Sequence, residues 1–294
     1  MAEKLSGVYP ILSTPFDETH RVDVESLERE VEYLIEAGVD GLGLGLASEV
    51  PRLTEAERDL VLDTLVRVAR GRVPVVMKSD ADGTDLALHY SRRAAERGAT
   101  ALMVMPPPGA PAGGVRAYYH EIARQVGRPI FIQDVPTAPV APALAAQIAA
   151  ELEHPWYLKA ESPPTAPRVG EAVAAGGATL TVFGGAHGAF FVEELRRGSV
   201  GTMPGALVPE AYVTTWRLWR EGRGADAEAH FARYGTLLRL LAQPTGIGTY
   251  LVKEALRLQG VFRHAVVRPP AVRPDELAYQ ELRRQLDGLG VRLS

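Results

Sequence analysis

The pattern that recurs along the whole chain is clearest at residues 101–133, which read ALMVMPPPGAPAGGVRAYYHEIARQVGRPIFIQ. This stretch begins and ends with short apolar runs, Ala101–Met105 and Pro129–Gln133, and each run has the length of a buried strand. Between them lie a proline-rich loop and a segment with helical spacing, about Val115–Val126. Strand, helix and strand in this order predict two parallel strands joined by a crossover helix.

Eight such units follow one another along the first three quarters of the chain. The predicted strands span residues 8–13, 41–46, 73–77, 101–105, 129–133, 156–160, 180–183 and 200–203. The helices that follow them are expected near residues 24–37, 55–69, 84–97, 115–126, 142–152, 167–175, 189–197 and 210–221. Eight units with no break in composition favour a closed (β/α)8 TIM barrel, of the α/β class, over an open doubly wound sheet.

The last quarter of the chain has little strand character. Gly222 and Gly224 interrupt the helical pattern, and further helices are expected near residues 225–241, 246–258 and 274–286. We therefore assign residues 1–222 to the barrel and residues 223–294 to a C-terminal helical extension of the same domain.

The composition argues against several classes of partner. Of the 294 residues, 46% are hydrophobic and 23% are charged, and the net charge of −4 comes without a basic stripe, so we expect no nucleic acid partner. No apolar stretch approaches the roughly 18 residues of a membrane span, and residues 1–6 do not resemble a signal peptide, so the chain is expected in the cytoplasm without a membrane partner. There is no cysteine, and the seven histidines form no HxH or HExxH pair. We therefore expect no metal site and no cofactor.

Lysine is scarce in this chain, and its positions are therefore informative. Four lysines stand against 28 arginines: Lys4, Lys78, Lys159 and Lys253. Lys159 ends a predicted strand, at the barrel face where TIM barrels hold their active sites, and only an amine condenses with a carbonyl. Lys78 also ends a strand, but its neighbours Asp80 and Asp82 suit an ion pair better than a nucleophile. The other two lysines are expected at the solvated surface.

Glu161 follows Lys159 by two residues. If the strand continues that far, alternation places both side chains on the same face. A carboxylate there could take the C3 proton of an imine formed on the lysine. It could equally be a simple counter-ion of the lysine, and the sequence leaves both interpretations open.

Short motifs at matching spacing resemble the dihydrodipicolinate synthase / N-acetylneuraminate lyase family of class I aldolases over essentially the full length. The motifs are GVYP at 7–10 leading into TPF at 14–16, GLASE at 45–49 where the family has G-T-T-G-E, VP at 135–136, LK at 158–159 and GT at 201–202. The resemblance implies a Schiff base between Lys159 and a small 2-oxo acid, and a homo-oligomer, expected as a tetramer. Together with their places near the carboxyl ends of the predicted strands, it makes the following residues candidate substrate contacts: Thr14, Ala47, Glu49, Gln133, Asp134, Gly185 and Val200.

The chain departs from the family pattern at positions that bear on the reaction. Gln133 stands where a tyrosine usually relays protons, and the paired threonines of the family are Leu46 and Ala47. The arginine with which dihydrodipicolinate synthases bind the aldehyde substrate would fall at Ala138. These losses argue against the synthase activity itself.

The segments Ala47-Ser48-Glu49 and Lys159-Ala160-Glu161 resemble those of 2-keto-3-deoxy-L-arabonate dehydratase and similar sugar-acid dehydratases. We therefore favour dehydration of a 2-keto-3-deoxy sugar acid, with Glu161 as the base at C3. Ser48, directly or through water, would assist loss of the C4 hydroxyl, and Gln133 would hydrogen-bond the substrate. The first alternative is a pyruvate-dependent aldolase that cleaves a 4-hydroxy-2-oxo acid. The second is a sensor that binds a 2-oxo acid without turnover.

Overall fold

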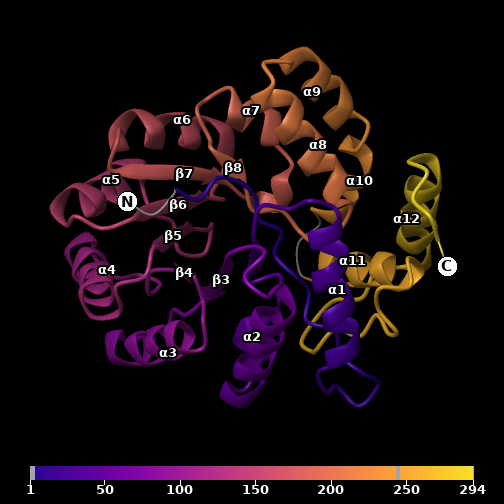
Figure 1. Cartoon of the computed structure of the whole chain (residues 1–294), viewed down its shortest axis with the longest axis horizontal. Helices are drawn as coiled ribbons and strands as arrows, with labels where there is room; N and C mark the ends of the chain where they lie inside the picture. Colours follow the sequence, from indigo (N-terminus) through magenta and orange to yellow (C-terminus); the bar gives the residue numbers. More distant parts are fainter. Residues whose placement is uncertain (1–3, 243–245, 294) are drawn as a thin grey trace.

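The computed structural model describes residues 4–242 and 246–293, and eight parallel strands form its centre (Figure 1). The hydrogen-bonded order of the strands is β1-β8-β7-β6-β5-β4-β3-β2. The strands are β1 (Gly7–Val8), β2 (Leu42–Leu44), β3 (Val75–Lys78), β4 (Ala101–Val104), β5 (Ile130–Asp134), β6 (Trp156–Ala160), β7 (Leu180–Gly184) and β8 (Gly201–Thr202). A parallel bridge between Ile11 and Gly43 joins the segment after β1 to β2. The fold is therefore the expected (β/α)8 TIM barrel.

Helices surround the strands and continue beyond them at one side (Figure 1). Those of the barrel are α1 (Val24–Glu36), α2 (Glu55–Ala69), α3 (Thr84–Glu96), α4 (Ala112–Val126), α5 (Pro142–Glu151), α6 (Thr165–Gly176), α7 (Phe191–Leu195) and α8 (Pro209–Arg220). Those beyond it are α9 (Gly224–Ala232), α10 (Gly235–Leu241), α11 (Ile247–Leu258) and α12 (Glu276–Gly288). The division at residue 222 stays a prediction, and α9 packs directly on α8 across it.

Several elements differ from the expected boundaries, and three show the largest changes. The first strand was expected over residues 8–13, but its regular part is only Gly7–Val8, and Pro10 has no N–H to donate to the neighbouring strand β2. Pairing with β8 nevertheless continues, because the N–H groups of Tyr9 and Ile11 donate to the carbonyls of Thr202 and Pro204. The helix expected over residues 225–241 is two helices, α9 and α10. The helix expected over residues 189–197 is shortened to α7, which begins after the non-helical N-cap Phe190, and a separate 3-10 turn at Ala186–Gly188 precedes it.

The interior of the barrel is filled by a buried cluster that forms the floor beneath the ends of the strands. Its members are Tyr9, Ile11, Val76, Ala101, Met103, Phe131, Tyr157, Phe183 and Met203. Phe131 and Tyr157 stack with their ring centroids 4.6 Å apart. Three of these residues, Val76, Phe131 and Tyr157, lie on β3, β5 and β6. Because side chains alternate along a strand, the next inward residues on these strands are Lys78, Gln133 and Lys159. The packed floor thus lies directly beneath three polar side chains.

No helix of the described residues is both long and apolar enough to cross a membrane. Within the same residues, no group of three or more histidine, aspartate or glutamate side chains is arranged to hold a metal ion. The cytoplasmic location stays a prediction.

Candidate active site

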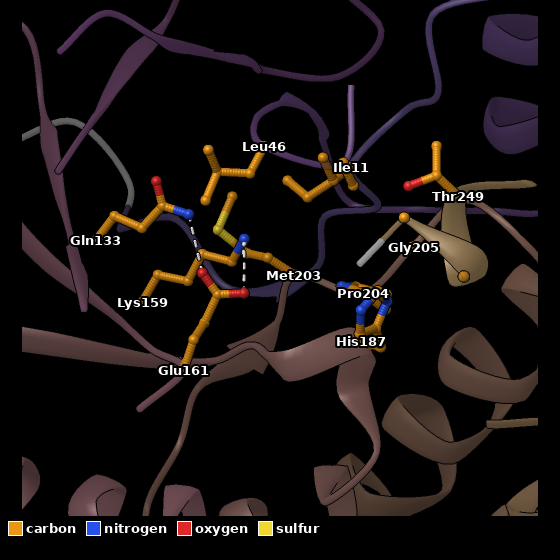
Figure 2. Close-up of a pocket in the computed structure, with 13 residues that line it drawn as sticks. Ile11, Leu46, Gln133, Lys159, Glu161, His187, Met203, Pro204, Gly205 and Thr249 are labelled. Carbon is orange, nitrogen blue, oxygen red and sulfur yellow. Dashed lines mark hydrogen bonds and ion pairs between the residues drawn. The ribbon is translucent and has the colours of Figure 1, made fainter. Parts of the chain in front are cut away.

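A cavity of about 320 Å³ opens at the carboxyl ends of the strands, where this class of barrel holds its active site (Figure 2). Its lining includes the segment after β2, the ends of β5 and β6, the turns after β7 and β8, and the start of α11. The lining residues are Ile11, Leu46, Ala47, Gln133, Lys159, Glu161, His187, Met203, Pro204, Gly205, Gly246, Gly248 and Thr249. Among these, Lys159 carries the only ammonium group and Glu161 the only carboxylate.

Lys159 stands at the end of β6 with its side chain 4% exposed. Its Nζ lies 3.3 Å from Oε1 of Glu161. The Glu161 N–H donates to the Asp134 carbonyl at 2.9 Å, so pairing with β5 extends one residue beyond the strand. Lys159 and Glu161 therefore share the inward face, as the alternation of side chains requires.

Three donors hold the Glu161 carboxylate in place. Besides the ammonium of Lys159, Oε1 accepts from the Ala186 N–H at 3.2 Å, and Oε2 accepts from Nε2 of Gln133 at 2.9 Å. Figure 2 shows Gln133, Lys159 and Glu161 pointing toward one another. A Cβ at position 185 would lie 2.3 Å from Cγ of Glu161, so Gly185 leaves the space that this carboxylate occupies. Gly185 thus contributes to the site because it has no side chain to displace Glu161.

Lys78 lies on the same interior face and forms the expected ion pair. Its Nζ is 2.5 Å from Oδ1 of Asp80 and 3.4 Å from Oε1 of Gln133. Burial lowers the pKa of the Lys78 amine, and the Asp80 carboxylate opposes that shift. Lys78 is 3% exposed and does not line the cavity.

His187 is a cavity residue to which the sequence pattern gave no role. It follows β7 in the left-handed conformation, with φ of 59°, and its carbonyl accepts from the Tyr212 hydroxyl at 2.7 Å. Burial lowers the pKa of the imidazole, although the carboxylate of Glu161 raises it. The ring is therefore mostly uncharged at neutral pH and offers one donor and one acceptor. The signal available in the sequence was the Gly-Gly-Ala-His turn at the end of a strand.

Ser48 and Thr14 lie behind the cavity rather than in its lining. The Ser48 hydroxyl donates to the Leu12 carbonyl at 2.5 Å and accepts from the Gly45 N–H at 3.0 Å. The Thr14 hydroxyl donates to the Ser48 carbonyl at 2.6 Å. Both side chains are fully buried, and their bonds fasten the turn after β2 to the segment after β1. These positions do not support the expected direct roles in catalysis and substrate binding.

Glu49 and Lys253 form a second buried ion pair, with Oε1 and Nζ 2.5 Å apart. Lys253 was expected at the solvated surface, and that prediction is wrong, because its side chain is 0% exposed. Burial lowers the pKa of this lysine to about 8, against the opposing effect of Glu49. Tyr250 and Leu256, three residues to either side on α11, could have indicated the burial of Lys253. Glu49 pairs with Lys253 and does not line the cavity.

Asp134 and Val200 were also expected to contact substrate, and the structure places both away from the cavity. Asp134 follows Gln133 on β5, so its side chain points to the opposite face. There it pairs with Arg168 at 3.0 Å and accepts from the Ser162 hydroxyl at 2.6 Å. Val200 precedes β8 at the far end of the strand and packs against the interior cluster. Of the ten residues expected in the site, Lys159, Glu161, Gln133 and Ala47 line the cavity.

The fold and the site define a barrel enzyme with a lysine–carboxylate pair in an open cavity, and the comparisons with known proteins identify its family. The model of the dihydrodipicolinate synthetase family matches residues 4–289. The chain belongs to this family and is a lyase.

Two relatives illustrate the range of activities among similar proteins. L-2-keto-3-deoxyarabonate dehydratase of Azospirillum brasilense is 33% identical over 301 residues, which cover 97% of this chain and 96% of the relative. The 4-hydroxy-tetrahydrodipicolinate synthase of Xanthomonas axonopodis pv. citri is 29% identical and covers 95% and 97%.

Solved structures of the same fold superpose closely. Dihydrodipicolinate synthase from Thermotoga maritima is 25% identical with a TM-score of 0.92, and the match covers 99% of this chain and 100% of that one. YagE from E. coli K12, solved in complex with pyruvate, is 23% identical with a TM-score of 0.91, over 98% and 99% of the two chains. These likenesses confirm the barrel with its C-terminal helices.

Proposed function

We propose that the protein dehydrates a 2-keto-3-deoxy sugar acid through a Schiff base on Lys159. The observation that carries the proposal is the pair of Lys159 and Glu161 at 3.3 Å in the cavity, with an amide, Gln133, where a titrating tyrosine would otherwise stand. The dehydratase relative, similar to this chain over nearly its whole length, supports the same reaction class.

The chemistry begins at the amine. Uncharged Lys159 attacks the C2 carbonyl, and water leaves as the iminium ion forms. Glu161 then takes a C3 proton, which the iminium has acidified, and an enamine results. The proton held by Glu161 leaves with the C4 hydroxyl as a second molecule of water. With a pentonate, transfer of a C5 proton to C3 turns the unsaturated imine into an enol between C4 and C5. This enol becomes the aldehyde when C4 gains a proton and the C5 hydroxyl loses one, and hydrolysis of the imine restores the enzyme.

The remaining lining residues provide recognition in this proposal. The amide of Gln133 and the ring of His187 offer hydrogen bonds to substrate hydroxyls, and Ala47 leaves room beside them. Ser48 takes no direct part, since both of its hydrogen bonds go to backbone groups.

The second candidate is retro-aldol cleavage of a 4-hydroxy-2-oxo acid to pyruvate and an aldehyde. His187 favours it, because an uncharged imidazole is a suitable base for the proton of the C4 hydroxyl. The two reactions share the imine and differ in which proton is taken. We do not retain the sensor hypothesis, because the chain is a lyase.

The experiment that separates these reactions supplies 2-keto-3-deoxypentonate and identifies the products by mass spectrometry. Dehydration yields 2-oxoglutarate semialdehyde without pyruvate. Release of pyruvate together with a small aldehyde would replace the dehydratase proposal by the aldolase. Assembly into a homo-oligomer, expected as a tetramer, is a further prediction that sedimentation analysis tests.

A further inference from the structure

A row of polar groups crosses the barrel interior from β3 to β6, and the proposed reaction uses only part of it. The row runs from Asp80 through Lys78 and Gln133 to Glu161 and Lys159. Lys78 stands second in the row, buried and outside the cavity lining, so it does not touch a bound substrate. Hydrogen bonding from Lys78 to the reacting groups must therefore pass through a neighbour.

That neighbour is Gln133, whose amide is held between two groups of opposite charge. Its Oε1 lies 3.4 Å from the ammonium of Lys78, and its Nε2 donates to the Glu161 carboxylate at 2.9 Å. An ammonium only donates and a carboxylate only accepts, so both ends of the amide are matched. Turning the amide over would place its NH2 group against the ammonium and its oxygen against the carboxylate. Lys78 therefore selects one of the two amide orientations.

The selected orientation matters because of what it supplies to Glu161. Oε1 of this carboxylate is shared by the ammonium of Lys159 and the Ala186 N–H, whereas Oε2 accepts from Gln133. A reversed Gln133 amide would remove that donor and place its own oxygen against Oε2 of Glu161. The carboxylate would then be free to rotate about its side chain and leave the position from which it reaches C3.

We propose that Lys78 is a positioning residue, which orients the Gln133 amide and thereby holds the Glu161 carboxylate toward C3 of the imine. The inference rests on the proposed Schiff base at Lys159 and on Glu161 as the base, and it does not depend on which sugar acid is the substrate. Asp80 completes the arrangement, because its Oδ1 pairs with Lys78 and also accepts from the Met105 N–H at 3.1 Å.

The test uses pyruvate alone and follows exchange of its methyl protons in D2O by NMR. This exchange requires the imine and the base at C3 but no complete turnover. Lys78 and its counter-ion are removed together in the variant K78M/D80N, since removing one partner would leave a buried charge uncompensated. Gln133→Met removes the amide, and the variant K78M/D80N/Q133M completes the cycle. Borohydride trapping of pyruvate and thermal melting are measured for each protein.

We expect K78M/D80N to trap pyruvate as the wild type does, since neither residue lines the cavity, and exchange is compared per trapped enzyme in the two variants that change Gln133. Exchange should slow about tenfold in K78M/D80N and in Gln133→Met, and the combined variant should be no slower than Gln133→Met, because the two residues act as one unit. The acid limb of the exchange profile should also move to higher pH, since the base has lost a donor that favours its charged form.

Two outcomes would overturn the role of Lys78: exchange at the wild-type rate in K78M/D80N, or multiplied losses in the combined variant. The failure of the proposed function would look different, because the wild-type enzyme would then neither trap pyruvate nor exchange its protons. If K78M/D80N does not fold, the pH profile of Gln133→Met decides. An acid limb unchanged from the wild type would then overturn the inference.

Discussion

Two buried lysine–carboxylate pairs, built from the same residue types, occupy different environments in this barrel. Lys159 and Glu161 lie 3.3 Å apart beside a cavity of about 320 Å³, and Glu161 is 16% exposed. Lys253 and Glu49 lie 2.5 Å apart with side chains 0% and 3% exposed, and neither lines the cavity. Pairing and burial are therefore common to both, and access to a small molecule distinguishes them.

The surroundings of Lys253 explain why it remains structural. Its ammonium donates to the Val266 carbonyl at 2.8 Å and lies 4.4 Å from the centroid of the Phe16 ring. Burial lowers its pKa to about 8, which is the direction that activates a lysine as a nucleophile. This lowered pKa does not make Lys253 an imine-forming residue, because it lies outside the cavity lining and no substrate carbonyl reaches it.

The largest expected effect is that of Lys159→Arg. A guanidinium keeps the positive charge and the partner Glu161 but cannot condense with a ketone, so turnover should fall by at least about 10⁴-fold. Borohydride trapping with pyruvate should disappear, while circular dichroism and the melting temperature show a folded barrel. Residual trapping in this variant would mean that another amine forms the imine.

Lys253→Met should affect stability rather than chemistry. It leaves the Glu49 carboxylate buried without its main partner, which costs about 3 kcal/mol of unfolding free energy, and denaturant titration measures the loss. The variant K253M/E49Q, in which no buried charge is left unpaired, should recover most of the stability. A folded Lys253→Met enzyme that has lost trapping would contradict the structural assignment of this pair.

Glu161→Gln tests the carboxylate of the pair that lines the cavity. The amide cannot accept the C3 proton, so turnover should slow by at least about 100-fold while trapping of pyruvate by Lys159 persists. Steady-state assays and adduct mass report the two quantities separately. Turnover at the wild-type rate would mean that Glu161 is only a counter-ion of Lys159, as Glu49 is of Lys253.

Ser48→Ala carries the smallest expected effect on the reaction. Per folded molecule, turnover should change by less than about threefold, because the hydroxyl bonds only to the backbone of Leu12 and Gly45. Stability should fall by about 1–3 kcal/mol, because two buried backbone groups lose their partner. A turnover loss comparable to that of Glu161→Gln would restore Ser48 to the mechanism.

The fold was predictable because its signals are local and repeated. The helix at residues 55–69 and the strand at residues 156–160 have the bounds that the apolar spacing predicts. Prediction was weaker where a single residue changes the geometry. Pro10 interrupts the regular pairing of the first strand, and a left-handed His187 forms a 3-10 turn between β7 and α7.

The site was predictable where strand alternation applies and, at Ala47 and Gln133, from the family resemblance. Alternation placed Lys159 and Glu161 on one face, and the same rule applied to β5 would have turned Asp134 away from Gln133 and outward to Arg168. It could not show that the Ser48 hydroxyl is bonded to Leu12, since that contact joins segments 36 residues apart. The pairing of Lys253 with Glu49 spans 204 residues and depends on how α11 packs on the barrel.

The most direct measurement is the mass-spectrometric location of the adduct formed when wild-type protein is reduced with borohydride in the presence of pyruvate. Our account predicts one adduct per chain, on the peptide that contains Lys159, with Lys78 and Lys253 unmodified. A reduced adduct on either of those lysines, or none on Lys159, would contradict the assignment of the accessible pair as the catalytic one.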